Sequence, residues 1–374
     1  MTTTPQTRYL TLHVLSALPW HNLNRDERGM PKTLTQGGVS RAMLSSQSLK
    51  RAARLAYEQS VSDASYRSAG HAHQLVADRV AAIAVRDGKP VPDPDKTSKA
   101  AREAVSLLVK KAAAEGAETR ADKDTNVWLS EDEIDLLAHA VLAETSAKDA
   151  AKQVGDGGAT ASLAIAAFGR MFAASPHQQT VAAIAVSPAT TTHAMIFETD
   201  YFTVVDDLNE LYAEAAAAKG ASFLDSAHYT SGVYYRAITI DRDQLRRSWS
   251  SFADPAAAGR VRALVRSLVL ALPSGKAASS APYTKPLLVL AEEQTTRTAY
   301  EFDTPVTPDT DGGYKRRSVE ALIAQRADAL AFDPAGFGPA TAAGTQIAQL
   351  TFDENVTTGN LDTVVDHVER WLFR

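Results

Sequence analysis

Residues 41–54 read RAMLSSQSLKRAAR and predict that a helix follows the first strand of the fold. Two serines and a glutamine (residues 45–47) precede a run of strong helix formers, which is the pattern of a helix with a serine N-cap. On that helix Lys50, Arg51 and Arg54 gather on one face, because positions three and four apart are neighbours. The opposite face is rich in leucine and alanine, and it is suited to packing on a sheet.

The start of this helix has the features of an anion-binding site. A helix N-terminus presents unpaired N–H groups and partial positive charge. Here the side chains of Ser46 and Gln47 lie beside the three cations. We interpret the segment as a grip on the phosphates of a nucleic acid. An ordinary solvated basic face is the alternative.

The charge distribution favours the phosphate interpretation. The 374-residue chain has a net charge of −5, yet its first 60 residues contain eight Lys or Arg and three Asp or Glu. That segment therefore carries +5 and the remainder −10. A basic patch on an acidic protein predicts a local polyanion site rather than general adhesion to nucleic acid.

Composition limits the class of protein. With 45% hydrophobic residues, the chain is long enough to bury a sizeable core. It has no cysteine, which excludes disulfides and thiolate metal sites and is typical of a reducing compartment. The sequence has no signal-peptide pattern and no apolar run near the ~20 residues that a membrane span needs. We therefore expect a cytoplasmic protein without a membrane partner.

The order of predicted elements indicates the fold class. Alternation predicts a strand at residues 7–15, the basic helix follows to about Gln59, and residues 65–154 have helical patterns. The pair Ser130 and Glu133 predicts a capping box for a helix that continues to about Val154. The remaining expected elements are extended segments at 161–172, 232–241 and 286–293, and helices at 256–272, 316–331 and 359–373.

Two long insertions interrupt this order, a helical one at about 60–157 and a protrusion at about 175–230. Without them the order is strand, helix, strand, strand, helix, strand. Ferredoxin-like domains have this order, and RNA-recognition-motif (RRM) domains use it as well. The sequence therefore predicts an α+β fold.

Two segments near the expected strands carry further candidate site residues. The loop LNRDERG (23–29) offers Asn24 and Arg25 to a phosphate or a base edge, and Asp26 to a metal or a hydrogen bond. The segment FGRMF (168–172) offers Arg170 to a phosphate and the flexible Met171 as a wedge against a base. The alternatives are a common polar turn and a snorkelling arginine beside a core methionine.

The loop PSGKAASSAPYTKP (273–286) contains Lys276 with hydroxyl and backbone groups that are suited to cradling phosphate. It lacks the spacing of a P-loop, so the sequence does not support nucleoside triphosphate binding. A plain flexible loop is the alternative.

The protrusion contains MIFETDYFTVVDDL (195–208), in which Tyr201 and Phe202 are adjacent and point to opposite faces of an extended chain. The surrounding acids argue against a phosphate groove. They are compatible with a wedge that stacks on a base, or with docking on the basic surface of a neighbour. Ordinary core aromatics are the alternative.

The sequence does not indicate catalysis. Its nine histidines form no convincing set of metal ligands. No HExxH, GxSxG or GxGxxG motif occurs in a suitable context. We therefore expect no enzymatic activity, no metal and no cofactor.

Several of these segments together resemble one known family. The sequence is similar to the CasC-type backbone subunit (Cas family seven) of the type I-E CRISPR Cascade complex, which binds guide RNA. The similar segments occur in the same order along the chain: TLHVL (11–15), LNRD (23–26), Gly37–Gly38, SSQSLKRAAR (45–54), FGRM (168–171), TTH (191–193), TDYFTVVDDL (199–208), SGVYYR (231–236) and PSGK (273–276).

The resemblance implies the shape of a right hand. An RRM-like palm would comprise residues 1–60, 158–175 and 231–374, helical fingers residues 61–157, and an extended thumb residues 176–230. Copies would stack head to tail along the CRISPR guide RNA (crRNA), and each thumb would displace a base at regular intervals. The other bases would remain free to pair with target DNA in antiviral defence. The implied partners are crRNA, target DNA through the guide, further copies of the chain, and the large, small, guide-5′-end and guide-processing subunits of Cascade.

The resemblance also implies a role for each candidate residue. Arg170 and Met171 would contact the RNA backbone and wedge a base, and Tyr201 and Phe202 would serve as the thumb wedge. The residues expected to hold RNA phosphates are Asn24, Arg25, Arg41, Ser46, Gln47, Lys50, Arg51, Arg54 and Lys276.

Two other functions remain as alternatives. Related backbone subunits of type III systems cut bound RNA with a loop aspartate, and Asp26 lies in a comparable early loop. The chain would then be a metal-dependent ribonuclease. A small-molecule enzyme with an α+β fold is the third possibility, and no motif supports it.

Overall fold

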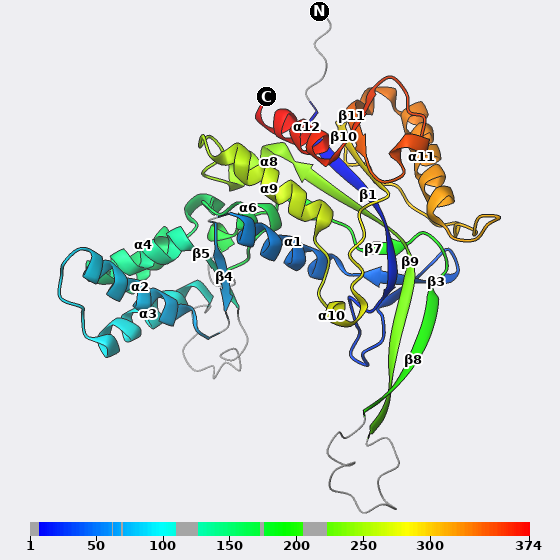
Figure 1. Cartoon of the computed structure of the whole chain (residues 1–374). Coiled ribbons are helices and arrows are strands. Elements are labelled where there is room, and N and C mark those ends of the chain that lie inside the picture. Colours follow the sequence, from blue (N-terminus) through cyan, green and yellow to red (C-terminus); the bar gives the residue numbers. More distant parts are fainter. Residues whose placement is uncertain (1–6, 62, 69, 110–125, 173–175, 205–222) are drawn as a thin grey trace, which may run out of the picture.

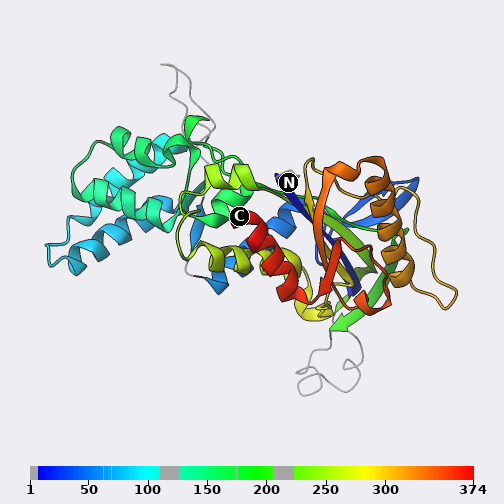
Figure 2. The same cartoon turned by 90° about the horizontal axis from the view of Figure 1, so that it is seen from above.

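The computed structural model describes residues 7–61, 63–68, 70–109, 126–172, 176–204 and 223–374. Within them, one large, mostly antiparallel sheet has helices on both faces (Figures 1 and 2). We call this part the palm. Its strands are β1 (Tyr9–His21), β2 (Thr33–Gln36), β3 (Val39–Leu44), β6 (Ile184–Val186), β7 (Ala189–Thr191), β8 (Ile196–Val204), β9 (Phe223–Asp241), β10 (Leu288–Gln294), β11 (Phe337–Ala343) and β12 (Val356–Gly359). Its helices are α1 (Ser46–Ser60), α6 (Leu163–Phe168), α8 (Arg242–Ser248), α9 (Ala257–Leu270), α10 (Ala277–Ser280), α11 (Lys315–Phe332) and α12 (Leu361–Phe373).

The sheet confirms the predicted fold class. Its strand order is β12-β11-β10-β1-β9-β7-β3-β2, and β6 and β8 also pair with β9. Strands β1, β6, β9 and β10 follow the ferredoxin-like order, since β1 lies between β10 and β9 and pairs antiparallel with both. Helix α1 connects β1 with the β6 side of the sheet, and α9 connects β9 with β10. The protein is therefore α+β, with an RRM-like palm that carries insertions.

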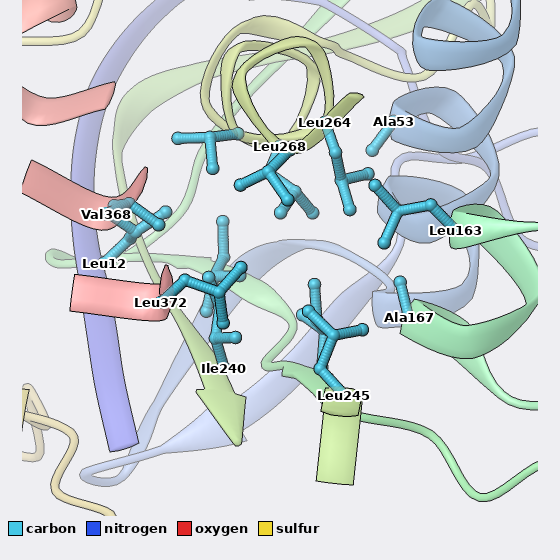
Figure 3. Close-up of a cluster of buried hydrophobic side chains, with 14 of the residues drawn as sticks. Leu12, Ala53, Leu163, Ala167, Ile240, Leu245, Leu264, Leu268, Val368 and Leu372 are labelled. Atoms are coloured by element: carbon cyan, nitrogen blue, oxygen red, sulfur yellow. The ribbon is translucent and has the colours of Figure 1, made fainter. Parts of the chain in front are cut away.

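One face of the sheet packs against α1, α9 and α12. Strand β1 directs alternate residues such as Leu12 to this face, where they meet the apolar stripe of α9. Leu264 and Leu268 of α9 and Leu372 of α12 point into the same cluster (Figure 3). This is the largest apolar core within the described residues.

The opposite face of the sheet is also covered. Tyr300 and Phe302, from the segment before α11, pack over Leu15 of β1 and Tyr235 of β9, and Leu322 of α11 joins the same cluster. The ring of His13 stacks on that of Tyr300 with 4.4 Å between centroids. The face that lies opposite α1 and α9 is therefore a second core rather than an open surface.

The fingers form a separate helical unit with its own apolar core. In Figure 1 they extend from the palm beyond one end of α1. Their elements are β4 (Ser65–Ser68), α2 (Ala72–Arg86), α3 (Pro94–Val109), β5 (Val127–Ser130), α4 (Glu131–Leu142) and α5 (Ala147–Gln153). Strands β4 and β5 pair antiparallel although α2 and α3 separate them in the chain, and they lie in a region whose sequence predicts only helices.

The predicted capping box is confirmed, but the helix that it opens is shorter than predicted. The Ser130 hydroxyl accepts the backbone N–H of Glu133, and the Glu133 carboxylate accepts that of Ser130. Helix α4 ends at Leu142, and Glu144 adopts a φ of 53°. This left-handed backbone stops the helix, and α5 begins with a new N-cap at Ser146.

The prediction of an extended segment at 161–172 is wrong. These residues contain helix α6, and Leu163 to Ala167 are all fully buried. A short segment that is buried on every side has no polar face, so its apolar run does not distinguish a helix from a strand.

The thumb is shorter than the predicted range of 176–230. Strands β6 and β7 within that range pair with β9 in the palm sheet. The protrusion is the hairpin of β8 and β9, which extends away from the palm in Figure 1. The tip of the protrusion lies outside the described residues, and so do the acids at 206 and 207. Among the described helices, none combines the length and apolarity needed to traverse a bilayer.

A buried carboxylate joins the second core to α11. Glu292 of β10 accepts a hydrogen bond from the Tyr300 hydroxyl at 2.7 Å, lies 3.2 Å from His13 Nε2, and pairs with Arg326 of α11. Burial alone would raise the pKa of Glu292. The hydrogen bonds from His13 and Tyr300, together with the charge of Arg326, instead lower that pKa to about 2.

The depressed pKa of Glu292 predicts a pH-dependent contribution to stability. A carboxylate whose folded-state pKa lies below its unfolded value stabilises the fold above the unfolded pKa, and this contribution is lost as pH falls through the folded pKa. We expect Glu292→Gln to destabilise the protein at neutral pH, and the difference from wild type to shrink between about pH 4.5 and 2. Urea unfolding across that range measures the difference, and a constant gap would contradict the prediction.

Candidate nucleic-acid interface

The start of α1 is fixed by contacts with the loop at residues 22–32. Ser45 is the N-cap, and its hydroxyl accepts the backbone N–H of Ser48 at 3.4 Å. The Asn24 side-chain oxygen accepts the N–H of Ser45 at 2.8 Å. Asn24 therefore positions the helix, while Ser46 and the exposed Gln47 occupy its first turn. That turn contains no acidic residue, which leaves its partial positive charge uncompensated.

The three predicted cations of α1 differ in their availability. Arg51 is exposed and Lys50 is half-buried, and burial lowers the pKa of Lys50. The side chain of Arg54 is only 13% exposed and pairs with Glu58 at 2.9 Å. Among the described residues, no carboxylate lies within ion-pair distance of Lys50 or Arg51. These two residues can therefore accept a phosphate, whereas Arg54 already has a partner.

Asp26 stabilises its own loop. One of its carboxylate oxygens accepts the backbone N–H groups of Arg28 and Met30, both at 2.9 Å. Arg25 and Arg28 are exposed beside it. No group of three or more potential ligands for a metal ion occurs in the described part of the chain. The hydrogen bonds to Asp26 therefore fix the loop backbone from which the exposed Arg25 and Arg28 project.

The loop at 273–286 packs against the 22–32 loop. The backbone N–H of Gly275 donates to the carbonyl of Leu23 at 3.2 Å. A Cβ at position 275 would lie 2.5 Å from that carbonyl oxygen, so only glycine permits this approach. The next residue is Lys276, whose ammonium lies 5.5 Å from the ring centroid of Tyr229. Lys276 therefore lies beside the loop that carries Arg25.

Arg41 does not lie on this surface, which corrects the prediction that it holds RNA. The residue is fully buried, and its guanidinium donates to the backbone carbonyls of Gln36, Thr191, Phe302 and Asp303. Burial lowers its pKa despite nearby acidic residues. Arg41 joins β3 to the segment that covers the sheet, and no guanidinium surface is left for a phosphate.

Arg170 is also buried, so the structure contradicts a direct phosphate contact for this residue. Its side chain is 1% exposed, pairs with Glu133 of α4, and donates to the carbonyl of Trp128 at 3.0 Å. The ring of Phe172 lies 4.4 Å below the guanidinium. Arg170 follows a helix rather than a strand, and it connects the palm to the fingers. Its neighbour Met171 is 73% exposed, as a wedge requires.

The two thumb aromatics point to different faces of the β8–β9 hairpin. Phe202 pairs directly with Asp225 and shares its face with Glu198 and Asp200. Tyr201 pairs with Ser226. The exposed Phe197 and Leu224 lie on the Tyr201 face. Tyr201 is 74% exposed and Phe202 is 39% exposed. One face is thus acidic, and the other is aromatic and apolar.

The structure adds one cation that the sequence analysis missed. Arg67 of β4 is exposed, and its guanidinium lies 4.4 Å from the ring centroid of Trp128 on the paired strand. Nothing in the sequence indicates that β4 and β5 pair, because a helical interpretation places residues 67 and 128 in unrelated helices. Neither the charge count nor any motif singles out this arginine.

Comparisons with known proteins identify similar sequences and folds. The model of the CT1975-like protein family matches residues 10–367. A solved chain from a structure described as "CRISPR RNA-guided surveillance complex, pre-nicking" is 23% identical and has a TM-score of 0.75, with 96% of this chain and 99% of that chain covered. A chain from a structure described as "CRISPR RNA-guided surveillance complex" is 20% identical and has a TM-score of 0.68, with 97% and 99% covered. At these identities the two structures show the same fold. No curated protein matches the sequence.

The burial of Arg170 predicts a role in stability rather than in RNA contact. Arg170→Ala leaves Glu133 buried without its partner, and we expect the free energy of unfolding to fall by about 3–5 kcal/mol. The matched control is Arg79→Ala in the fingers, which removes a partly exposed pair with Asp135 and should cost about 0–1 kcal/mol. Chemical unfolding measures both variants. An Arg170→Ala protein with the stability of the control but weaker RNA binding would instead support a phosphate contact.

Proposed function

The chain belongs to the CT1975-like protein family, and we propose that it is a backbone subunit of a CRISPR surveillance complex that binds guide RNA. The sequence resemblance supports the finer assignment to a type I-E Cascade. Copies of the chain polymerise along the crRNA, hold its phosphates and displace bases at intervals, so that the remaining bases pair with target DNA. The other Cascade subunits are its further partners.

One observation carries this proposal. Lys50 and Arg51 lie in the second turn of α1, after its capped start, without a carboxylate partner among the described residues, although the chain as a whole is acidic. The exposed Arg25 and the half-buried Lys276 lie on loops that contact each other. Unpaired cations and helix N–H groups on one surface bind the phosphate backbone without reading sequence. Sequence is then read by base pairing, as in RNA-guided complexes.

The subunit holds RNA and does not cut it. Both backbone N–H groups that Asp26 accepts belong to its own loop, so the position of this carboxylate is explained by loop geometry. This favours a binding role over the alternative of a metal-dependent ribonuclease. Cleavage of bound RNA on addition of Mg²⁺, abolished by Asp26→Ala, would contradict this part of the proposal.

The proposed grip predicts a specific change in the salt dependence of binding. Each phosphate contact on a single strand contributes about 0.7 to the slope of log affinity against log salt, so Lys50→Ala with Arg51→Ala should flatten the slope by about 1.4. The matched control removes two exposed adjacent cations of α8, through Arg246→Ala and Arg247→Ala. Titrations with oligouridine and with a mixed-sequence RNA measure both variants. The affinity loss should be equal for the two RNAs, and a strongly sequence-dependent loss would refute the backbone grip.

The thumb predicts a second test, because base–aromatic stacking contributes about 1–3 kcal/mol. Tyr201→Ala should reduce RNA-dependent assembly about tenfold, and by more than Phe202→Ala does, since Tyr201 is more exposed and lies on the face without acids. Thr203→Ala, on the same face as Tyr201, is the control. Sedimentation with RNA measures assembly. Thermal unfolding of the protein without RNA should be unchanged, and a lower melting temperature would show that the ring belongs to the core.

A further inference from the structure

Arg67 lies at the boundary between the palm and the fingers. Its strand, β4, follows α1 after a short connection and pairs with β5 in the register Arg67 opposite Trp128. The guanidinium of Arg67 lies 4.4 Å from the centroid of the Trp128 ring. An arginine on an aromatic ring keeps its N–H groups directed outward in a fixed plane. The exposed Arg67 is therefore oriented without being enclosed.

The support beneath Arg67 is rigid. The indole N–H of Trp128 donates to the Ser65 hydroxyl at 2.8 Å, and the Trp128 carbonyl accepts from Arg170 at 3.0 Å. Trp128 itself is buried. A cation on such a support loses little conformational entropy when it binds an anion, because its orientation is already restricted.

The local charges leave Arg67 without compensation. The guanidinium of Arg54 lies 5.6 Å from the same Trp128 ring, and its carboxylate partner is Glu58. No carboxylate among the described residues lies within ion-pair distance of Arg67. The partial burial of its guanidinium, and then the charges of Arg54 and Arg51, lower the pKa of Arg67. Electrostatic repulsion between these cations is relieved when an anion binds beside them.

We propose that Arg67 is a further contact for the phosphates of single-stranded RNA, and that it extends the cation row of Lys50 and Arg51 from the palm onto the fingers. Arg54 is a positioning residue in this arrangement. Its guanidinium pairs with Glu58 of the same helix and donates to the carbonyl of Ser65, which connects α1 to β4. The planar guanidinium of Arg67 can give two parallel hydrogen bonds to one phosphate. This inference rests on the proposed RNA-binding function.

The test compares variants of the full chain by titration with a labelled oligouridine at several salt concentrations. Arg67→Gln should weaken binding about tenfold and flatten the salt slope by about 0.7. Arg67→Lys keeps the charge but loses the planar fork, so it should retain the slope and recover only part of the affinity. Arg79→Gln is the control, because Arg79 is also a fingers arginine but pairs with Asp135.

The outcomes separate this inference from the function on which it depends. If Arg67→Gln binds like wild type while the Lys50 and Arg51 double variant is weakened, the inference is overturned and the RNA-binding function stands. If the wild-type protein does not bind oligouridine, the proposed function itself fails. If Arg67→Gln lowers the melting temperature and leaves affinity unchanged, Arg67 only clamps Trp128, which also overturns the inference.

Discussion

The hydrogen bonding of strand β9 joins the thumb to the palm sheet. This 19-residue strand pairs with β1, β6 and β7 in the palm and with β8 in the thumb. Because one continuous strand belongs to both units, the palm sheet sets the direction in which the thumb leaves it. At the base of the thumb, the Trp20 ring stacks on Tyr229 with 3.6 Å between centroids. A Cβ at Gly232 would lie 2.8 Å from the His193 ring, so glycine is required where β7 and β9 meet.

Burial divides the basic residues into two groups with different roles. Arg41, Arg170, Arg236, Arg242 and Arg326 are buried, and each donates to backbone carbonyls or pairs with carboxylates. Lys50 and Arg51 have no such partner among the described residues. A buried guanidinium has exchanged water for fixed acceptors, and a phosphate would have to displace those acceptors. The number of Lys and Arg residues in a sequence is therefore only an upper limit on the number of phosphate contacts that the folded protein can make.

Local signals in the sequence predict many elements correctly. The serine N-cap of α1 and the capping box of α4 depend on neighbouring residues, and helices α9 and α12 each have a clear apolar stripe. Segments without such a stripe were predicted incorrectly, as α6 shows, because complete burial removes the contrast between faces. The burial of Arg41 and Arg170 could not be predicted, because their partners Phe302 and Glu133 come from other parts of the chain. For the same reason, Arg67 carries no signal before β4 and β5 pair.

Both faces of the palm sheet are covered, so the candidate binding residues do not lie on a sheet face. RRM domains stack bases on aromatic rings that project from the open face of their sheet. Here the rings on that face, including Tyr235, Tyr300 and Phe302, pack against each other beneath α11. A base could reach them only if this core opened, and that would expose the buried Glu292 network. Accessible cations occur instead at the start of α1, on the 22–32 loop and on β4, and accessible aromatics occur on the thumb. Because both faces of the sheet are occupied, the proposed RNA site consists of these accessible residues rather than of a sheet face.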